Sequence, residues 1–253
     1  MTDVELFSSE VFPLLSILVR STSTVDLEVA RGWVLELFGE FNPAPFFFSP
    51  VRFERCERTG DSLSLTLSGE HCYGLGFGPV PPVNPTWTRC SIDKSTYGDE
   101  CGALVATERW DFYSIDTAQC ENEGQLAIVD DSDVIRQILT TNAPQSKVWP
   151  GNPEIVDWYG VRDAHGEWAS IAALVRWESG RHVLSSVVTV AQVRGQGFAR
   201  RLVRGIGGEM QRQGFRWLGL GVAHDNTSAQ RTYEGAGFQR CADFTAYGVP
   251  ATE

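Results

Sequence analysis

The stretch that decides the fold is Val187–Ala199, which reads VVTVAQVRGQGFA. An apolar, β-branched run leads into Arg194-Gly-Gln-Gly, and an amphipathic helical pattern follows at once. A helix that begins directly after such a loop presents unpaired backbone N–H groups and the positive end of its dipole. Gly195 and Gly197 let the backbone curl closely around a bound group, because they carry no Cβ. The pattern therefore predicts a strand, a glycine loop and a helix N-terminus that holds a diphosphate.

Two familiar nucleotide-binding motifs do not fit this loop. Its glycine spacing differs from the dinucleotide fingerprint GxGxxG, and it lacks the GK[ST] ending of a P-loop. A glycine-rich turn that binds no ligand is the plain alternative for two glycines taken alone. Arg194 can add positive charge beside the phosphates.

A second motif lies downstream, where residues 226–238 read NTSAQRTYEGAGF. Asn226, Ala229 and Tyr233 are separated by three and four residues, so on a helix they share one face. Taken alone, Tyr233 and Phe238 also suit the apolar face of a core helix. Two motifs in this order, on a predicted loop and a predicted helix, favour a shared ligand site.

The two segments resemble the [QR]-x-x-G-x-[GA] and N-x-x-A-x-x-x-Y-x-x-x-G-F signatures of GNAT-superfamily N-acetyltransferases. Thr189, five residues before Arg194, is similar to the glycine N-acyltransferase-like branch. Gln192 to Gly197 also fits the first signature, but the strand-to-helix transition favours the Arg194 register. The resemblance implies an α/β GNAT fold, with a mixed, mostly antiparallel central sheet flanked by helices.

The resemblance also implies the chemistry, which is direct transfer of an acetyl group from acetyl-CoA to a primary amine in a ternary complex. Tyr233 is then the general acid that protonates the CoA thiolate, since a tyrosine with a pKa near ~10 can supply that proton. The residues expected to bind the co-substrate acetyl-CoA are Val188, Thr189, Val190, Arg194, Gly195, Gln196, Gly197, Phe198, Ala199, Arg200, Asn226, Ala229 and Tyr233.

The general base is less well indicated. Many relatives carry a glutamate on the strand before the glycine loop, where this chain has Ser185 and Ser186. His224, after the predicted strand Phe215–Val222, is the candidate base because its ordinary pKa suits proton transfer near neutrality. Asp225 and Glu178 are alternatives, and a structural role for His224 stays open. Three aromatic residues are candidates for the acceptor pocket: Trp158, Tyr159 and Trp177.

Residues 119–253 are expected to form the GNAT domain, and residues 1–118 an additional α+β domain. That N-terminal half is possibly a degenerate GNAT-like half, and it shows no second glycine motif, so no second CoA site is expected. Strands are expected at Phe46–Cys56, Ser62–Leu67, Ala103–Ile115, Leu126–Val129, Ile155–Arg162, Glu167–Trp177, His182–Val190, Phe215–Val222 and Phe238–Val249. Helices are expected at Val4–Arg20, Val25–Leu37, 132–140, 199–213 and Thr227–Glu234, and a loop at Gly74–Trp87.

The amino-acid composition limits the classes of partner that the chain is expected to bind. A formal net charge of -11 with no basic stripe argues against nucleic acid and suits a cationic amine. No CxxC pair occurs among the six cysteines, so no metal site is expected. The apolar stretch Val11–Val19 is too short to cross a bilayer and follows acidic residues, which predicts a cytoplasmic protein without membrane attachment. The competing hypothesis is a non-catalytic acyl-CoA-binding regulatory module, and the oligomeric state is not indicated.

Overall fold

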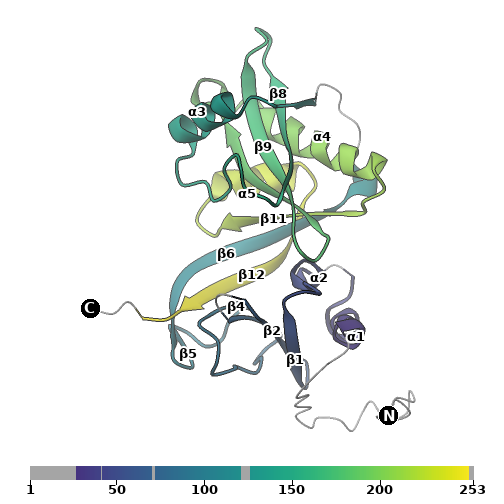
Figure 1. The fold of residues 1–253 in the computed structure, drawn as a ribbon, viewed down its shortest axis with the longest axis vertical. Helices are drawn as coiled ribbons and strands as arrows, with labels where there is room; N and C mark the ends of the chain where they lie inside the picture. The colour runs from purple at the N-terminus through teal and green to yellow at the C-terminus, as the bar shows by residue number, and fades with distance from the viewer. Residues whose placement is uncertain (1–26, 41, 70–71, 121–125, 251–253) are drawn as a thin grey trace. The chain divides into compact units, whose positions relative to one another are not determined.

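The computed structural model describes residues 27–40, 42–69, 72–120 and 126–250 (Figure 1). The chain divides into two compact units, unit 1 with residues 1–40, 50–109 and 243–253, and unit 2 with residues 41–49 and 110–242. This division differs from a single boundary after residue 118, because each unit is built from separated parts of the chain. The expected helix Val4–Arg20 lies outside the described residues.

The sheet of unit 2 runs in the order β12-β6-β11-β10-β9-β8-β7. Its strands are β6 (Leu104–Asp116), β7 (Ala127–Ile128), β8 (Ile155–Arg162), β9 (Trp168–Arg176), β10 (His182–Thr189), β11 (Trp217–Ala223) and β12 (Gln239–Gly248). Neighbouring strands from β6 to β7 pair antiparallel except β10 with β11, which pair parallel. This is the GNAT fold predicted above, a mixed and mostly antiparallel sheet flanked by helices.

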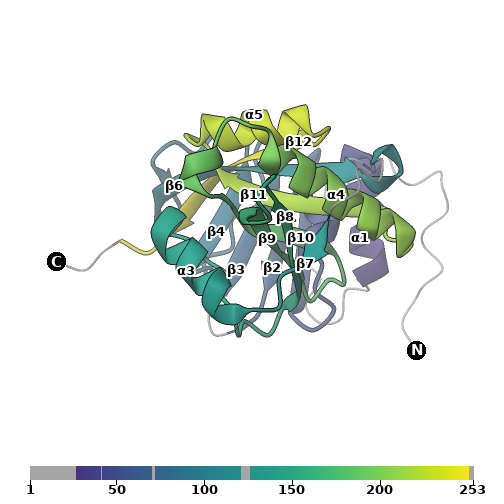
Figure 2. The same ribbon diagram turned by 90° about the horizontal axis from the view of Figure 1, so that it is seen from above.

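Helices cover both faces of this sheet. Helix α4 (Phe198–Arg212) and helix α5 (Thr227–Gly235) pack on one face, where Leu202, Ile206 and Met210 are fully buried. Helix α3 (Ser132–Asn142) lies on the other side of the strands (Figure 2). The N-terminus of α3 is capped, because the carboxylate of Asp131 accepts the backbone N–H groups of residues 133 and 134.

The parallel pair of strands in unit 2 is short. His182–Leu184 of β10 pair with Leu218–Leu220 of β11, and the recorded pairs end there. Just beyond, a bulge between Ser185 and Val188 shifts the register of β10 against β9, and Ser186 adopts φ +48°. The end of β10 therefore leaves β11, and its backbone edge is available to a ligand.

Unit 1 repeats the pairing pattern of unit 2. Its strands are β1 (Phe53–Thr59), β2 (Ser62–Leu67), β3 (Tyr73–Phe77), β4 (Arg89–Asp93) and β5 (Glu100–Cys101), with helix α1 (Leu27–Phe38). β1 pairs antiparallel with β2, β2 antiparallel with β3, and β3 parallel with β4. The later part of β12 pairs antiparallel with β4.

Two expectations for this region were wrong. The expected strand Phe46–Cys56 is a short helix α2 (Ala44–Phe47), which belongs to unit 2, followed by β1. The Asn42 side chain accepts the N–H of Ala44 at 2.8 Å and starts that helical turn. The expected loop Gly74–Trp87 contains most of β3, because its glycines leave room for large neighbours rather than break the strand.

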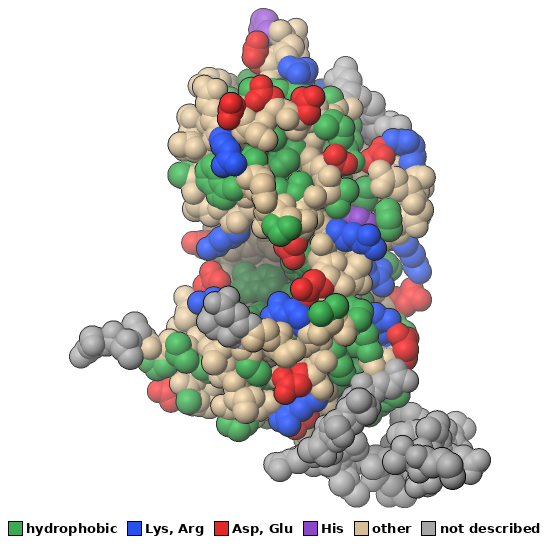
Figure 3. Space-filling view, viewed as in Figure 1, with side chains coloured by type: hydrophobic (Ala, Val, Ile, Leu, Met, Phe, Trp, Pro, Cys, Tyr) green, Lys and Arg blue, Asp and Glu red, His purple; other side chains and the backbone are tan. Residues whose placement is uncertain are grey.

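Two long strands contribute to both units. Residues 104–109 of β6 belong to unit 1 and the rest to unit 2, whereas β12 changes unit between Ala242 and Asp243. No helix among the described residues is long and apolar enough to cross a membrane. On the face drawn in Figure 3, the basic side chains of the described residues lie among acidic ones instead of forming one broad patch.

Candidate active site

The glycine loop has the geometry that the sequence predicts. Gly195 and Gly197 adopt φ +78° and φ +81°, a left-handed conformation that other residues rarely adopt, and open space lies where their Cβ atoms would be. Gly197 is the N-cap of α4 and supplies no side-chain cap. The first backbone N–H groups of α4 are thus left for a ligand, which is the arrangement that binds phosphate.

A cavity of about 740 Å³ opens beside this loop. It is lined by residues from the glycine loop, the end of β10, α5 and the chain after α3. The predicted co-substrate residues that line it are Val188, Thr189, Arg194, Gly195, Gly197, Phe198, Ala199, Arg200, Asn226, Ala229 and Tyr233. The two separate sequence motifs therefore meet at one cavity.

Two of the predicted co-substrate residues, Val190 and Gln196, do not line the cavity. The backbone N–H of Val190 donates to the carbonyl of Ala169 at 3.0 Å, next to the last β10–β9 pair, Thr189 with Ser170. Val190 is thus tied to the neighbouring strand, and the backbone groups of Val188 and Thr189 are the nearer candidates.

Helix α5 presents its motif face to the cavity. The Asn226 side chain caps the helix by accepting the N–H of Ala229 at 3.1 Å, so this residue both lines the cavity and sets where α5 begins. Tyr233 is 7% exposed, and its ring lies against Tyr113 and Phe238, with centroids 6.3 and 6.2 Å apart. Burial raises the pKa of Tyr233 to about 12, so its hydroxyl keeps its proton at neutral pH.

Positive charge gathers at this cavity although the chain is acidic. Arg194, Arg200 and Arg231 all line it. Arg194 also has a structural task, because its guanidinium donates to the carbonyls of Thr189 at 3.1 Å and Asn142 at 3.2 Å. The cavity therefore offers both helix N–H groups and guanidinium groups to an anionic ligand.

The end of α3 and the chain after it also line the cavity, through three residues that the sequence did not indicate: Asn142, Ala143 and Gln145. Asn142 has a clear role, since its side-chain oxygen accepts the N–H of Ala191 at 2.9 Å and so holds the turn before the glycine loop. Asn142 is the last residue of α3, two positions beyond the predicted end of that helix, and nothing nearby in the sequence indicates a ligand. Val187, Thr227, Ser228, Arg231 and Thr232 also line the cavity without having been predicted.

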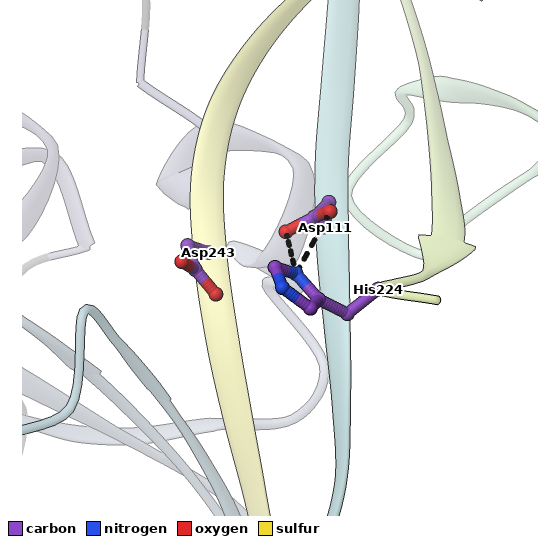
Figure 4. Close-up of side chains that lie close together, drawn as sticks. All are labelled: Asp111, His224 and Asp243. Carbon is purple, nitrogen blue, oxygen red and sulfur yellow. Dashed lines mark hydrogen bonds and ion pairs between the residues drawn. The ribbon is translucent and has the colours of Figure 1, made fainter. Parts of the chain in front are cut away.

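His224 lies in a polar network outside the residues that line the cavity. Its Nδ1 atom is 3.2 Å from the carboxylate of Asp111 (Figure 4). That carboxylate is 1% exposed, and it also accepts hydrogen bonds from Arg240 and from Gln230 of α5. Asp111 thus orients the imidazole and joins three strands to α5.

The three aromatic candidates for the acceptor pocket do not share one face of the sheet. Tyr159 packs in the core beneath α4. Trp158 is its neighbour on β8, so its side chain points to the opposite face. Trp177 is half-buried and contacts Phe47 and Phe112, whose rings lie on that opposite face.

Comparison with known proteins gives a consistent result. The model of the acetyltransferase (GNAT) family matches residues 108–238, just over half of the 253-residue chain. A GCN5-related N-acetyltransferase from Kribbella flavida aligns with 14% identity and a TM-score of 0.54, over 88% of this chain and 96% of its own. A Drosophila protein aligns with 11% identity and a TM-score of 0.55, over 91% and 97% of the two chains. No curated protein gives a significant match.

Proposed function

Because the chain belongs to the GNAT acetyltransferase family, we propose that it moves the acetyl group of acetyl-CoA to a primary amine in a ternary complex. Membership makes it an acyltransferase that uses an acyl-CoA and an acceptor. The observation that supports the finer proposal is a single cavity that brings the uncapped N-terminus of α4 together with the protonated hydroxyl of Tyr233.

The binding half of the proposal assigns the phosphates to the start of α4. Gly195 and Gly197 allow close approach, while Arg200 and Arg231 supply charge. Asn226 and Ala229 shape the wall along which the pantetheine arm lies. The backbone of Val188 and Thr189, on the part of β10 that has left β11, is the edge that hydrogen-bonds the arm and polarises the thioester carbonyl.

Tyr233 is the proposed general acid. The amine nitrogen forms a bond to the thioester carbon, the C–S bond breaks, and the departing thiolate takes the hydroxyl proton of Tyr233. Burial suits this role because a raised pKa keeps the hydroxyl protonated until the thiolate is released. Among the described residues none forms a hydrogen bond with the Tyr233 hydroxyl, which is consistent with a donor that faces the cavity.

His224 stays in the proposal as the candidate base on the strength of Asp111, whose buried carboxylate lies 3.2 Å from its Nδ1. Its position outside the cavity lining favours the structural alternative. The variant His224→Asn distinguishes a general base from a structural residue. A base predicts that the acidic limb of the kcat/KM profile disappears and the rate falls by about 10²-fold or more. A structural residue predicts a lower melting temperature with an unchanged pH profile.

The central experiment measures CoA release from acetyl-CoA with a panel of primary amines, for the wild type and for Tyr233→Phe. We expect turnover with at least one amine and a loss of about 10²-fold or more in kcat for the variant. Its affinity for CoA, measured by calorimetry, should stay within about threefold, because the ring that contacts Tyr113 and Phe238 is kept. An unchanged kcat removes Tyr233 from the mechanism.

The same experiment tests the competing function. Acetyl-CoA binding without turnover of any amine supports a non-catalytic acyl-CoA-binding module. A donor panel extended to longer acyl-CoAs tests the acetyl preference. The proposed kinship with the glycine N-acyltransferase-like branch rests on Thr189, and turnover of glycine itself is its direct test.

A further inference from the structure

Unit 1 contains two cysteine side chains that lie in contact and that the proposed mechanism does not use. Cys90 lies on β4 and Cys101 is the last residue of β5. Their Sγ atoms are 4.0 Å apart, and the thiol of Cys90 donates a hydrogen bond to the sulfur of Cys101. β4 pairs with β3 and β12, whereas β5 pairs with β6, so the two sulfur atoms meet through side-chain packing and not through a shared ladder.

Apolar side chains enclose this cysteine pair. Cys90 is 1% exposed and Cys101 is 0% exposed. They belong to a buried cluster whose members are Trp87, Cys90, Ile92, Cys101, Leu104 and Tyr247. A charged or bulky reagent is excluded from such surroundings, whereas a small neutral molecule can enter when the cluster opens locally. The pair is therefore expected to react only with small oxidants.

The two sulfur atoms do not have the ligand set of a metal site. A structural zinc site takes four protein ligands. Within the part of the chain that the structure describes, no third ligand atom from His, Cys, Asp or Glu lies within 4.8 Å of both sulfur atoms. Cys72 packs against the same cluster, but its Sγ contacts the hydroxyl of Thr86 at 3.6 Å. The chemistry that suits Cys90 and Cys101 is thus that of a dithiol.

We propose that Cys90 and Cys101 are a redox-sensitive pair, which a hydroperoxide oxidises to a disulfide that stabilises unit 1. The sulfur atoms of a disulfide are about 2 Å apart, so the two Sγ atoms have to approach each other by about 2 Å. The two strands that carry them are not paired with each other, so this approach breaks no backbone hydrogen bond between them.

The hydrogen bond between the two thiols gives each sulfur a different role. It lowers the pKa of Cys101, which accepts it, and together with burial it raises the pKa of Cys90, which donates it. The thiolate is the reactive form of cysteine. Cys101 is therefore the sulfur that attacks the oxidant, and Cys90 is the sulfur that completes the disulfide.

The oxidation needs one molecule of hydrogen peroxide and no other reagent. The Cys101 thiolate attacks one peroxide oxygen, an S–O bond forms, and the O–O bond breaks to release hydroxide. The sulfur of Cys90 then attacks the sulfenic sulfur of Cys101, so that the S–S bond forms and the S–O bond breaks. The two thiols lose two electrons and two protons, and the peroxide gains both to become two molecules of water.

The disulfide closes a ring of chain that forms one wall of a cavity in unit 1. This cavity has a volume of about 620 Å³, and the lining residues between the two cysteines are Lys94, Ser95, Gly98 and Asp99. The rest of the lining comes from the parts of β6 and β12 that belong to unit 1. Closing the ring removes conformational freedom from the unfolded chain. The oxidised protein is therefore more stable, and both ends of this cavity wall are tied together.

Mass spectrometry of the full chain locates the bond. Trypsin cleaves after Lys94, so Cys90 and Cys101 fall in two separate peptides, residues 90–94 and 95–109. The folded protein is treated with hydrogen peroxide, its free thiols are alkylated, and it is then digested. We expect the two peptides to be joined by one disulfide and to separate after reduction with dithiothreitol.

Two other cysteines of unit 1 serve as internal controls. Cys72 is half-buried, and the peroxide treatment is continued until this thiol is oxidised. Cys56 is 1% exposed, like Cys90, and burial raises its pKa, so it should remain a thiol. The proposal is overturned if Cys72 is oxidised while the two peptides stay unlinked. Oxidation of Cys56 to the same extent as the pair would also reject it, because every buried thiol would then react.

Thermal melting measures the stabilisation. The oxidised wild type should melt about 5 °C higher than the reduced protein, which is the order of shift expected for closing a ring of about a dozen residues. Cys101→Ser has a similar volume but forms no disulfide, so peroxide should not raise its melting temperature. Cys90→Ala provides the same comparison if the serine variant does not fold. Equal melting temperatures of the oxidised and reduced wild type, or a rise that persists in the variants, would overturn the stabilising role.

Discussion

Gly197 and Gly214 lie at opposite ends of α4 with nearly the same backbone angle, φ +81° and φ +82°. An alanine at either position has open space around its Cβ, so its cost is conformational and amounts to about 1 kcal/mol of stability. Only Gly197 lines the cavity. Gly197→Ala should therefore lower both the melting temperature and the CoA affinity, whereas Gly214→Ala should lower the melting temperature alone. Equal CoA affinities of the two variants would exclude the loop from phosphate binding.

The raised pKa of Tyr233 leads to a prediction about the reaction rate at alkaline pH. Its pKa is raised from the usual 10 to about 12 by burial, so the protonated acid persists as the pH rises through 10. The rate at saturating amine should show no Tyr233-dependent decline below about pH 11. Stopped-flow assays at pH 7 to 10.5, with the fold checked at each pH, measure this. A decline centred near pH 10 that Tyr233→Phe abolishes would contradict a buried acid.

At the scale of single residues, the sequence predicts best where a motif is local. Gly197, Asn226 and Tyr233 are fixed by spacing within one loop or one helix, and all three line the cavity. Asn142 is different, because it reaches Ala191 from 49 positions away. Such a contact depends on where α3 ends relative to β10, which no local pattern encodes.

At the scale of secondary-structure elements, the paired strands β10 and β11 begin with a buried titratable group, His182. His182 is the first residue of β10 and is 4% exposed, and its ring contacts the tilted ring of Phe215 with centroids 4.2 Å apart. Burial lowers its pKa, and Arg176, its partner across β9, lowers it further. The folded chain thus resists protonation of this imidazole, whereas the unfolded chain binds the proton near pH 6.5.

Stability should therefore fall as the pH drops below about 6.5, because there the unfolded state binds more protons than the folded state. Above that pH the group is neutral in both states and contributes no pH dependence. Urea unfolding of the wild type and of His182→Gln at pH 7.5 and 5.5 isolates the effect. The variant should lose less free energy of unfolding between these pH values, and an equal loss in both proteins would exclude His182.

Element types were predictable where periodicity and turn chemistry agree. Ser62–Leu67 and Ile155–Arg162 form the predicted strands with the predicted bounds. β3 was missed because its two glycines look like loop residues. In the structure a Cβ at Gly74 would lie 2.1 Å from the ring of Trp87, so the glycine is required by a distant aromatic side chain. Tertiary packing of this kind overrides local composition.

The whole chain should bind one CoA. In unit 1 the parallel strands β3 and β4 stay in register from Tyr73 with Arg89 to Gly76 with Ile92. The connection between them, residues 78–88, contains no helix, so no helix N-terminus is available for phosphate. We propose that unit 1 is a degenerate GNAT-like half without a CoA site. Calorimetry should give a stoichiometry of one, and two equivalents bound per chain would refute this.

The long strands β6 and β12 lead to a final prediction, which concerns the folding of the whole chain. A fragment of residues 119–253 keeps both motifs but lacks β6, whose residues Trp110–Asp116 pair with the whole of β11. It would expose β11 as an unpaired edge and remove Tyr113 from beside Tyr233. We expect this fragment to aggregate or to melt without a cooperative transition, whereas the full chain should melt cooperatively and bind CoA. Cooperative melting of residues 119–253 together with CoA binding would instead show that this segment folds alone, and that β6 only extends its sheet.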